Sequence, residues 1–156
     1  MNVNIVCVGK IKEAFFREAV AEYAKRLTRF CHFEVIEVAE EMLTGEGAKQ
    51  IDIVKEREGE RLLAKCKGTV FVLDLKGKQM TSEEFSGLLS DCMTGGESTI
   101  TFVIGGSYGL SPRVVERAKL SICFGKMTYP HQLMRVILAE QIYRGFMIKE
   151  GSVYHK

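Results

Sequence analysis

The sequence predicts an α/β protein in which a mainly parallel sheet is covered by helices on both faces. Three observations support this fold class. Apolar runs of strand length alternate with segments of helical periodicity along the 156 residues. That alternation is typical of strand-helix-strand units, whose strands lie parallel. No repeat, low-complexity segment or linker interrupts the chain, so we expect residues 1–156 to form one domain.

The first half of the chain predicts two strands, each followed by a helix. Residues 3–8 are an apolar run, after which apolar side chains recur at helical spacing. Residues 33–38 alternate apolar and acidic side chains, as expected of a strand with one solvated face near a sheet edge. A polar loop over 40–48 leads to a charged helix whose apolar positions lie within 51–63. The charges of 55–58 are expected on its solvated face.

The third strand and helix have clear boundary signals. Residues 69–75 form a strand rich in β-branched and aromatic residues, which we place centrally in the sheet. Lys76-Gly77 is expected to stop this strand. Thr81-Ser-Glu-Glu84 is a capping-box pattern that begins a helix of about ten residues. Gly95-Gly96 is expected to end that helix.

The last third contains two strands and two helices. Residues 99–104 form a strand that runs directly into a loop with three glycines. Ser111-Pro112 predicts an N-cap followed by proline at the first helical position, which begins a short helix through Ala118. A strand over 120–124 follows, and Pro130 opens a long apolar helix.

Composition places the chain among soluble globular proteins. Hydrophobic residues make up 46% and charged residues 27%, and no apolar run approaches the roughly 20 residues of a membrane span. No secretory signal is visible at the amino-terminal end, so a cytoplasmic location is expected. A formal charge of +2 is mildly basic, and it neither requires nor excludes an RNA partner.

The cysteines argue against a disulfide framework and against a zinc site. Their number is odd, they are widely scattered, and no pair has CxxC spacing. We therefore expect no bound metal and interpret the cysteines as buried thiols, at Cys7, Cys31, Cys66, Cys92 and Cys123.

Two loops at strand ends are the first candidate site. Residues 105–109, Gly-Gly-Ser-Tyr-Gly, match neither the dinucleotide fingerprint nor the phosphate-binding loop. The second loop, 124–130, follows the next strand along the chain. Because ligands bind at the carboxyl ends of strands in open α/β sheets, the two loops could form a crevice for an adenine edge or an amino-acid moiety. The alternative is a tight turn and an ordinary strand-to-helix connection.

The helix after Pro130 and the segment behind it hold the second set of candidates. The helix is apolar on more than one side, which predicts burial in the core or, as we favour, in a subunit interface. His131 is either a hydrogen-bonding residue at the helix start or a catalytic base. Arg135, Glu140 and Arg144 lie in apolar surroundings, where an unpaired charge is costly, so each is expected to have a partner or to face a site.

Four segments together resemble one known family. These are Phe102–Ser111, Lys126–Arg135, Ala139–Arg144 and Tyr154–Lys156. In combination they closely resemble the RlmH family, which are SPOUT-type methyltransferases of large-subunit ribosomal RNA. The resemblance spans the whole chain and includes Val8–Lys10 and Leu73–Leu75. Val153 stands where some relatives carry proline.

The resemblance implies a fold, a cofactor and a substrate. It implies an α/β knot, in which the C-terminal part threads through a loop to form a trefoil, and it implies a homodimer. The family binds S-adenosylmethionine in a bent form in the knot and methylates N3 of a pseudouridine in helix 69 of the 23S rRNA, on the assembled ribosome. The cofactor-binding positions carry over to Leu73, Gly105, Phe124, Gly125, Lys126, Met127, Thr128 and Tyr129.

Methyl transfer to this nitrogen requires loss of its proton, because a protonated imide nitrogen is a poor nucleophile. Our hypothesis is that His155, or a water that it holds, assists deprotonation and that Tyr154 helps to seat the base. Arg135 and Lys156 would contact the anionic RNA. His131 is the second choice as base. The segment 152–156 could instead be a frayed terminus.

Two other function classes remain open at this point. The strand-helix order also fits a nucleotide-binding enzyme with an unknotted sheet, although the glycine fingerprint of such enzymes is missing. A non-enzymatic, ribosome-associated RNA-binding module would use the basic side chains of the first helix, which are Arg17, Lys25, Arg26 and Arg29.

Overall fold

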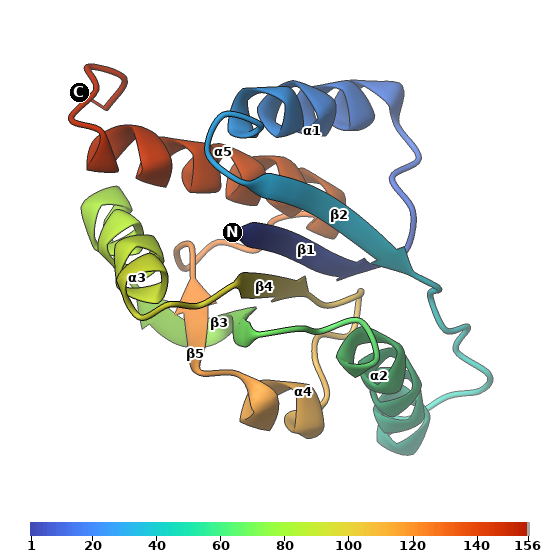
Figure 1. Cartoon of the computed structure of the whole chain (residues 1–156). Helices are drawn as coiled ribbons and strands as arrows, with labels where there is room; N and C mark the ends of the chain where they lie inside the picture. Colours follow the sequence, from blue (N-terminus) through green and yellow to red (C-terminus); the bar gives the residue numbers. More distant parts are fainter. Residues whose placement is uncertain (156) are drawn as a thin grey trace.

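A five-stranded parallel sheet forms the centre of the molecule (Figure 1). The computed structural model describes residues 1–155, and over that range strands and helices alternate as the sequence predicts. The strand order is β2-β1-β4-β3-β5, with every neighbouring pair parallel. The strands are β1 (Asn2–Val8), β2 (His32–Val38), β3 (Thr69–Gln79), β4 (Thr99–Ile104) and β5 (Leu120–Cys123).

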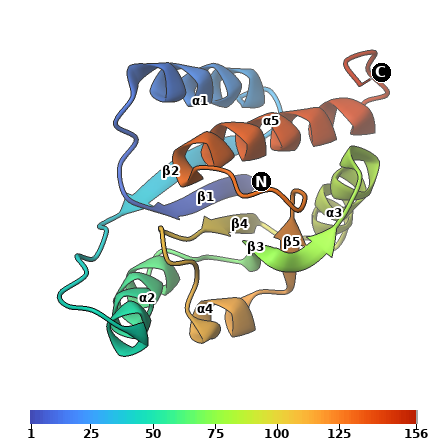
Figure 2. The ribbon, with the colours of Figure 1, turned by 180° about the vertical axis from the view of Figure 1, so that it is seen from behind.

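Helices cover both faces of this sheet, which confirms the predicted fold class. One face carries α1, α5 and α3, with α5 between the other two, and the opposite face carries α2 and α4 (Figures 1 and 2). The helices are α1 (Ala14–Leu27), α2 (Ala48–Leu63), α3 (Ser82–Thr94), α4 (Pro112–Arg117) and α5 (His131–Lys149). None of these helices of residues 1–155 is long and apolar enough to cross a membrane.

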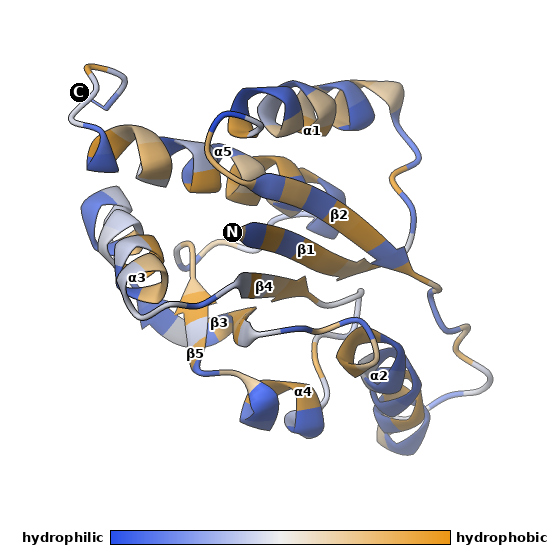
Figure 3. Cartoon of the chain, viewed as in Figure 1, coloured by the Kyte–Doolittle hydropathy of each residue, from blue (hydrophilic) through white to orange (hydrophobic). Residues whose placement is uncertain are grey.

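One apolar layer lies on each side of the sheet. The larger one contains Phe102 and packs beneath α1, α3 and α5, whereas the smaller one contains Val103 and packs beneath α2 and α4. Successive residues of a strand point to opposite faces, so a strand buried on both sides is apolar throughout. Figure 3 shows this apolar colouring along the inner strands. β2 is an edge strand with exposed acidic residues, as the sequence predicts.

The prediction for β3 is wrong in two respects. β4, not β3, occupies the centre of the sheet, and β3 lies between β4 and the edge strand β5. Lys76-Gly77 does not stop β3, which continues to Gln79 and pairs again with β5 after a shift in register. Gly77 is required there by a close backbone approach, since a Cβ at this position would lie 2.6 Å from the carbonyl carbon of Ser121. The glycine therefore allows the backbone of β5 to approach β3 closely, and it does not end the strand.

α5 is a core helix of its own chain. Leu138, Ala139 and Ile142 have no exposed surface, and the helix packs against both α1 and α3. Of the two predicted alternatives, burial in the core is thus what the chain itself shows. The five cysteines are free, and all but the half-buried Cys66 are buried. Burial raises the pKa of Cys7 and of Cys31 to about 11, so these thiols are protonated at neutral pH.

Candidate functional site

A pocket of about 760 Å³ lies at the carboxyl ends of β4 and β5, beside the middle of β3. We call it the strand-end pocket. Its walls come from residues 73–76, from 104–110, from the loop after β5 and from the start of α5. Both candidate loops thus border one cavity. Its volume is within the roughly 300–1,000 Å³ typical of small-molecule sites.

The pocket brings together most of the predicted cofactor positions, which lie far apart in the sequence. Seven of the eight line it, and Lys126 is the one that does not. The seven come from three segments: Leu73, Gly105, Phe124, Gly125, Met127, Thr128 and Tyr129. This arrangement follows from the sheet order, because β3 lies between β4 and β5 and all three strands run in the same direction.

The glycine loop, residues 105–109, brings bare backbone to the pocket wall. Its ends are joined by a hydrogen bond of 3.1 Å that the Gly109 amide donates to the Gly106 carbonyl. Gly109 has φ of 84°, a conformation that glycine adopts without strain. A Cβ on Gly105 would lie 3.0 Å from the carbonyl carbon of Gly109, so the turn closes only around a residue without a side chain.

Apolar and polar groups both line the pocket. Three exposed apolar or aromatic side chains line the pocket: Met127, which is 72% exposed, Tyr108 and Tyr129. Charged groups of both signs are present, with carboxylates at Asp74 and Glu116 and amines at Lys55 and Lys76. The pocket therefore offers apolar surface for a flat ring, backbone polar groups for the edge of that ring and charges of both signs for an amino-acid moiety.

His131 lies at the entrance of α5 and lines the same pocket. Burial, followed by the positive charge of Arg135, lowers the pKa of the His131 imidazole below its ordinary value of 6.5. The imidazole is therefore neutral at pH 7 and able to accept a proton, as the second choice of base requires.

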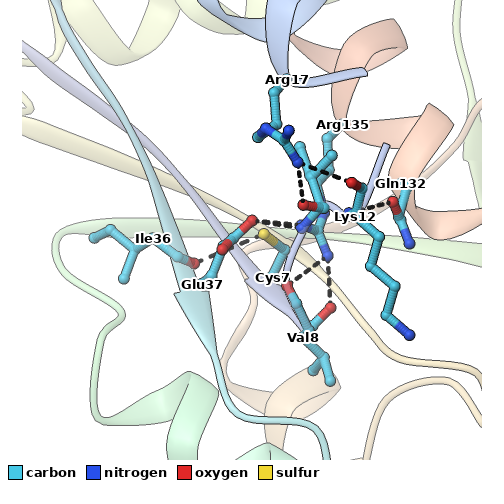
Figure 4. A network of polar contacts seen from close by, with 10 residues as sticks. Cys7, Val8, Lys12, Arg17, Ile36, Glu37, Gln132 and Arg135 are labelled. Carbon is cyan, nitrogen blue, oxygen red and sulfur yellow. Dashed lines mark hydrogen bonds and ion pairs between the residues drawn. The ribbon is translucent and has the colours of Figure 1, made fainter. Parts of the chain in front are cut away.

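Arg135 holds the first turn of α5 against the ends of two strands (Figure 4). One guanidinium nitrogen donates to Glu37 Oε1 at 3.0 Å, and another donates to the carbonyls of Val8 at 2.6 Å and Gly9 at 2.9 Å. The amide of Ile11 donates to the same Glu37 oxygen at 2.9 Å. This charge thus has the expected partners for two of its nitrogens, whereas its Nε is buried without a partner among residues 1–155.

The structure does not place Arg135 where the sequence hypothesis needs it. Its side chain has no exposed surface, so in this conformation it cannot contact RNA or a reacting base. Burial is the physical reason, because the guanidinium is surrounded by strand carbonyls and a carboxylate of its own chain. We assign it a positioning role for the start of α5 and for the adjacent His131.

The basic side chains of α1 and of the turn after it mostly have intramolecular partners. Arg17 donates to the carbonyls of Ile11 and Lys12, which holds the loop after β1 in place (Figure 4). Arg26 pairs with Glu22 and Arg29 with Glu150. These contacts weaken the hypothesis of an RNA-binding face on α1, because phosphates would have to replace existing partners.

The described part of the tail, residues 152–155, folds back on the C-terminal half of α5. Tyr154 Oη donates to Glu140 at 3.2 Å, and Arg144 donates to Glu140 at 2.9 and 2.6 Å. His155 Nδ1 lies 3.3 Å from Arg144, and its Nε2 lies 2.7 Å from Glu83. Arginine only donates, so Nδ1 accepts and Nε2–H donates to Glu83 when the ring is neutral.

These contacts fix the protonation states around the tail. Burial, with the Glu140 charge second, raises the pKa of Tyr154 to about 12. Its hydroxyl is therefore a donor at neutral pH. The hydrogen bond from His155 lowers the pKa of Glu83 to about 2, so this carboxylate stays charged. Both ring nitrogens of His155 are occupied in this conformation, and it becomes a base only after one partner leaves.

The start of α5 lines the strand-end pocket, whereas the tail follows the other end of this helix (Figures 1 and 2). His131 is the first residue of this 19-residue helix, and the tail follows its last turn. Because Tyr154 folds back to Glu140, nine residues after His131, about 14 Å of helix separates this contact from the helix start. The structure thus brings the pocket residues together and the tail residues together, but not the two groups within one chain. Lys156 lies outside the described residues.

Three carboxylates in or near the pocket were not predicted, and these are Asp74, Glu116 and Glu58. Asp74 is the second-to-last residue of the predicted strand 69–75. Its position at a strand end could therefore have marked it as a candidate pocket residue. Glu58 was expected on a solvated face and is instead 2% exposed. It lies four residues from Val54 and four from Leu62, which puts all three on the buried stripe of α2. Within residues 1–155, no cluster of three or more His, Cys, Asp or Glu could hold a metal ion.

Comparison with known proteins gives consistent results. The family model described as "Predicted SPOUT methyltransferase" matches residues 1–155. The chain is 54% identical to the Ribosomal RNA large subunit methyltransferase H of Ligilactobacillus salivarius and 52% identical to that of Clostridium botulinum. Each alignment covers 100% of both chains.

Solved structures share the fold at low identity. A probable methylase family protein from Haemophilus influenzae has a TM-score of 0.54 at 9% identity, with 99% of this chain and 70% of that one covered. The tRNA (m1G37) methyltransferase from Aquifex aeolicus has a TM-score of 0.52 at 13% identity, covering 92% and 70%. The family model and the full-length relatives lead to one conclusion: the chain belongs to the SPOUT methyltransferase family, as the resemblance in its sequence predicts.

Proposed function

We propose that this chain transfers a methyl group from S-adenosylmethionine to N3 of a pseudouridine in helix 69 of 23S rRNA. The observation that carries the proposal is the strand-end pocket, which gathers seven of the eight positions that the RlmH resemblance assigns to the cofactor. Relatives about half identical over their full length are named as large-subunit ribosomal RNA methyltransferases. The knot that the family implies would lie at this pocket.

The residues of the pocket fit S-adenosylmethionine. Bound there, this cofactor supplies a methyl group activated by a sulfonium. The backbone of the glycine loop and of the loop after β5 offers amides and carbonyls for an adenine edge. Carboxylates at Asp74 and Glu116 together with the amines of Lys55 and Lys76 offer charges of both signs for an amino-acid moiety. Aligning donor and acceptor in such a site supplies much of the catalysis.

Proton removal from N3 has two candidate residues. His155 or a water that it holds is our first choice, with Tyr154 as a hydrogen-bond donor that seats the base. His131 is the second choice, and it has the advantage of lining the pocket as a neutral imidazole. Loss of the base should lower the rate of transfer and leave cofactor binding intact, which identifies the residue.

We propose a homodimer on the basis of the separation between pocket and tail. In this conformation the tail is held by Glu140 and Glu83, which do not line the pocket, so if it takes part in the reaction we infer that it acts on the pocket of another copy. Exposed apolar side chains beside the pocket, at Leu75 and Met127, offer surface for such a contact. Each active site would then combine residues of two subunits, with Lys156 contributing an RNA contact.

The modest net charge favours a preassembled substrate. Phosphate contacts supply most of the nonspecific affinity for free RNA, and a formal charge of +2 provides few of them. We therefore propose that the enzyme acts on the assembled ribosome in the cytoplasm. Methylation should be much slower on deproteinised rRNA than on intact ribosomes.

The test is transfer of a labelled methyl group to ribosomes from a strain lacking this protein, followed by mapping of the modified nucleotide. Label at N3 of a helix 69 pseudouridine is the expected result, and label elsewhere contradicts the assigned target. Calorimetry with S-adenosylmethionine separates the enzyme from a non-enzymatic RNA-binding module. A module should show no heat of binding.

A further inference from the structure

Glu58 is a buried carboxylate that the catalytic scheme above does not use. It lies on α2 and is 2% exposed. Its Oε1 accepts a hydrogen bond of 3.0 Å from the Glu41 amide. Its Oε2 is buried and has no hydrogen-bond partner among residues 1–155. A buried carboxylate oxygen without a partner is costly, so its presence calls for a specific reason.

The unpartnered oxygen lies directly behind the glycine loop. A Cβ on Gly106 would come within 2.7 Å of Glu58 Oε2 and within 3.1 Å of Val8 Cγ1. Gly106 has φ outside the left-handed region, so its backbone conformation does not demand glycine. Space is restricted there instead, because an added side chain would meet the Glu58 carboxyl and Val8 unless these groups shift.

The next residue of α2 is fitted to the same segment. A Cβ on Gly59 would lie 2.5 Å from Ser111 Oγ, which is also buried without a hydrogen-bond partner in the described chain. Gly106 and Ser111 bracket the part of the chain that forms one wall of the strand-end pocket. Two consecutive positions of α2 therefore meet the rear of that wall, and neither Gly59 nor Gly106 has room for a Cβ unless its neighbour shifts.

We propose that Glu58 is a positioning residue for cofactor binding, whose carboxyl fixes the glycine loop from behind at Gly106. The residue touches neither ligand nor reacting atoms. It acts through the backbone that lines the pocket, and a displacement of about 1 Å at such a wall is enough to lower affinity substantially. This inference rests on the proposed use of the pocket for S-adenosylmethionine.

A double-mutant cycle between Glu58 and Gly106 tests the contact. The variants are Glu58→Ala, Gly106→Ala and their combination, with Glu58→Gln as the conservative replacement. Glu60→Ala, at an exposed carboxylate of the same helix, and Gly87→Ala, at a helical glycine with no atom within 4 Å of an added Cβ, are the matched controls. Calorimetry measures the dissociation constant of S-adenosylmethionine, and steady-state kinetics measures KM and kcat.

Glu58→Ala and Gly106→Ala should each weaken cofactor binding about tenfold, and the double variant should lose much less than the product of the two. Once the carboxyl is gone, the methyl group that Gly106→Ala adds loses its 2.7 Å clash and keeps the 3.1 Å contact to Val8 Cγ1. Glu58→Gln should bind within about threefold of wild type, because its shape and its acceptor for the Glu41 amide are kept. KM should rise with kcat little changed, whereas a general loss of folded protein would lower apparent kcat instead.

Multiplicative effects in the cycle, or wild-type affinity in Glu58→Ala, would overturn the proposal. If Glu58→Ala does not fold, Glu58→Asp takes its place, since the shorter carboxyl also withdraws from residue 106. Hydrogen exchange of residues 105–109 without ligand provides an independent measurement. Faster exchange in the Glu58 variants than in Glu60→Ala supports the positioning even if the wild type binds no S-adenosylmethionine. A wild-type protein that binds no S-adenosylmethionine would refute the proposed function itself.

Discussion

At the scale of single residues, Arg135 is a buried charge held by contacts from two of its guanidinium nitrogens, while its Nε is buried without a partner among residues 1–155. Arg135→Met removes the cation, so the carbonyls of Val8 and Gly9 lose their guanidinium donor and Glu37 keeps only the Ile11 amide. We expect the free energy of unfolding to fall by about 3 kcal/mol, because losing one partner of a buried pair leaves the others uncompensated. Urea denaturation measures this change.

Arg113→Ala is the matched control for this measurement. Its side chain is 59% exposed, and its contacts to Glu56 and Glu60 are long, at 3.9 and 3.7 Å. Exposed pairs of this kind contribute about 0–1 kcal/mol. Equal losses in the two variants would contradict the structural role given to Arg135.

Glu58 also predicts a dependence of stability on pH. Burial is the main cause that raises the pKa of Glu58 above its ordinary value of 4.5; the hydrogen bond from the Glu41 amide and the charge of Arg61 oppose it, and the charges of Glu40 and Glu41 add to it. A raised pKa means that the folded state binds the proton more tightly than the unfolded state. Stability from this group is therefore present at low pH and is lost as pH rises through 4.5 and the higher folded pKa.

Glu58→Gln cannot ionise, so it lacks this loss. We expect its free energy of unfolding to increase relative to wild type as pH rises from 4 toward 7, measured by urea denaturation at each pH. Glu60→Gln, at an exposed position, should follow the wild type throughout. A difference between Glu58→Gln and wild type that does not change with pH would refute the sign argued here.

At the scale of elements, the start of α3 combines two functions. Thr81 Oγ1 accepts from the Glu84 amide at 3.2 Å, and Glu84 Oε2 accepts from the Thr81 amide at 2.7 Å, which completes the predicted capping box. The same turn carries Glu83, the partner of His155. The cap therefore stabilises both the helix and the platform on which the tail docks.

Thr81→Ala should lower the free energy of unfolding by about 1 kcal/mol, the usual effect of losing such a cap. It should also speed hydrogen exchange of residues 150–155, because Glu83 then lies on a frayed turn. Thr94→Ala, which loses only a hydroxyl bonded to Ser90 at the other end of α3, should leave tail exchange unchanged. Unchanged hydrogen exchange of the tail in Thr81→Ala would contradict the claim that the cap stabilises tail docking.

At the scale of the whole molecule, the separation of pocket and tail predicts complementation between copies. A truncation lacking residues 154–156 and the pocket variant Gly105→Val should each be inactive. Mixed under conditions that exchange subunits, they should regain about a quarter of wild-type methyl transfer, since half of the dimers are mixed and each has one intact site. Methyl transfer to ribosomes measures this. No recovery, despite demonstrated exchange, would contradict a shared site.

The sequence was sufficient where the determining signal is local. Alternating strand and helix periodicity, the acidic pattern of β2 and the capping box at Thr81 depend on residues close in the chain, and all three are confirmed. The pocket was predictable because parallel strands bring their ends to one edge. The family followed from motifs spread over the whole chain.

The errors concern contacts between distant segments. Gly77 has the sequence appearance of a strand stop, but the backbone of β5 passes against it. Glu58 lies among charged residues, yet α2 turns it toward Gly106. Arg135 belongs to a motif rich in site residues, while strand carbonyls enclose its side chain. In each case the role depends on a neighbour far away in the chain, which local pattern does not encode.

The place of α5 between α1 and α3 has a consequence for how the protein is made. This helix follows every other described element in the chain, yet it covers much of the larger apolar layer. Until the ribosome has released it, the growing polypeptide presents the uncovered undersides of α1 and α3 to the cell. Contacts of such long sequence separation form slowly, and exposed apolar surface favours aggregation. Biosynthesis of this small protein therefore includes a vulnerable interval that ends only when its last helix docks.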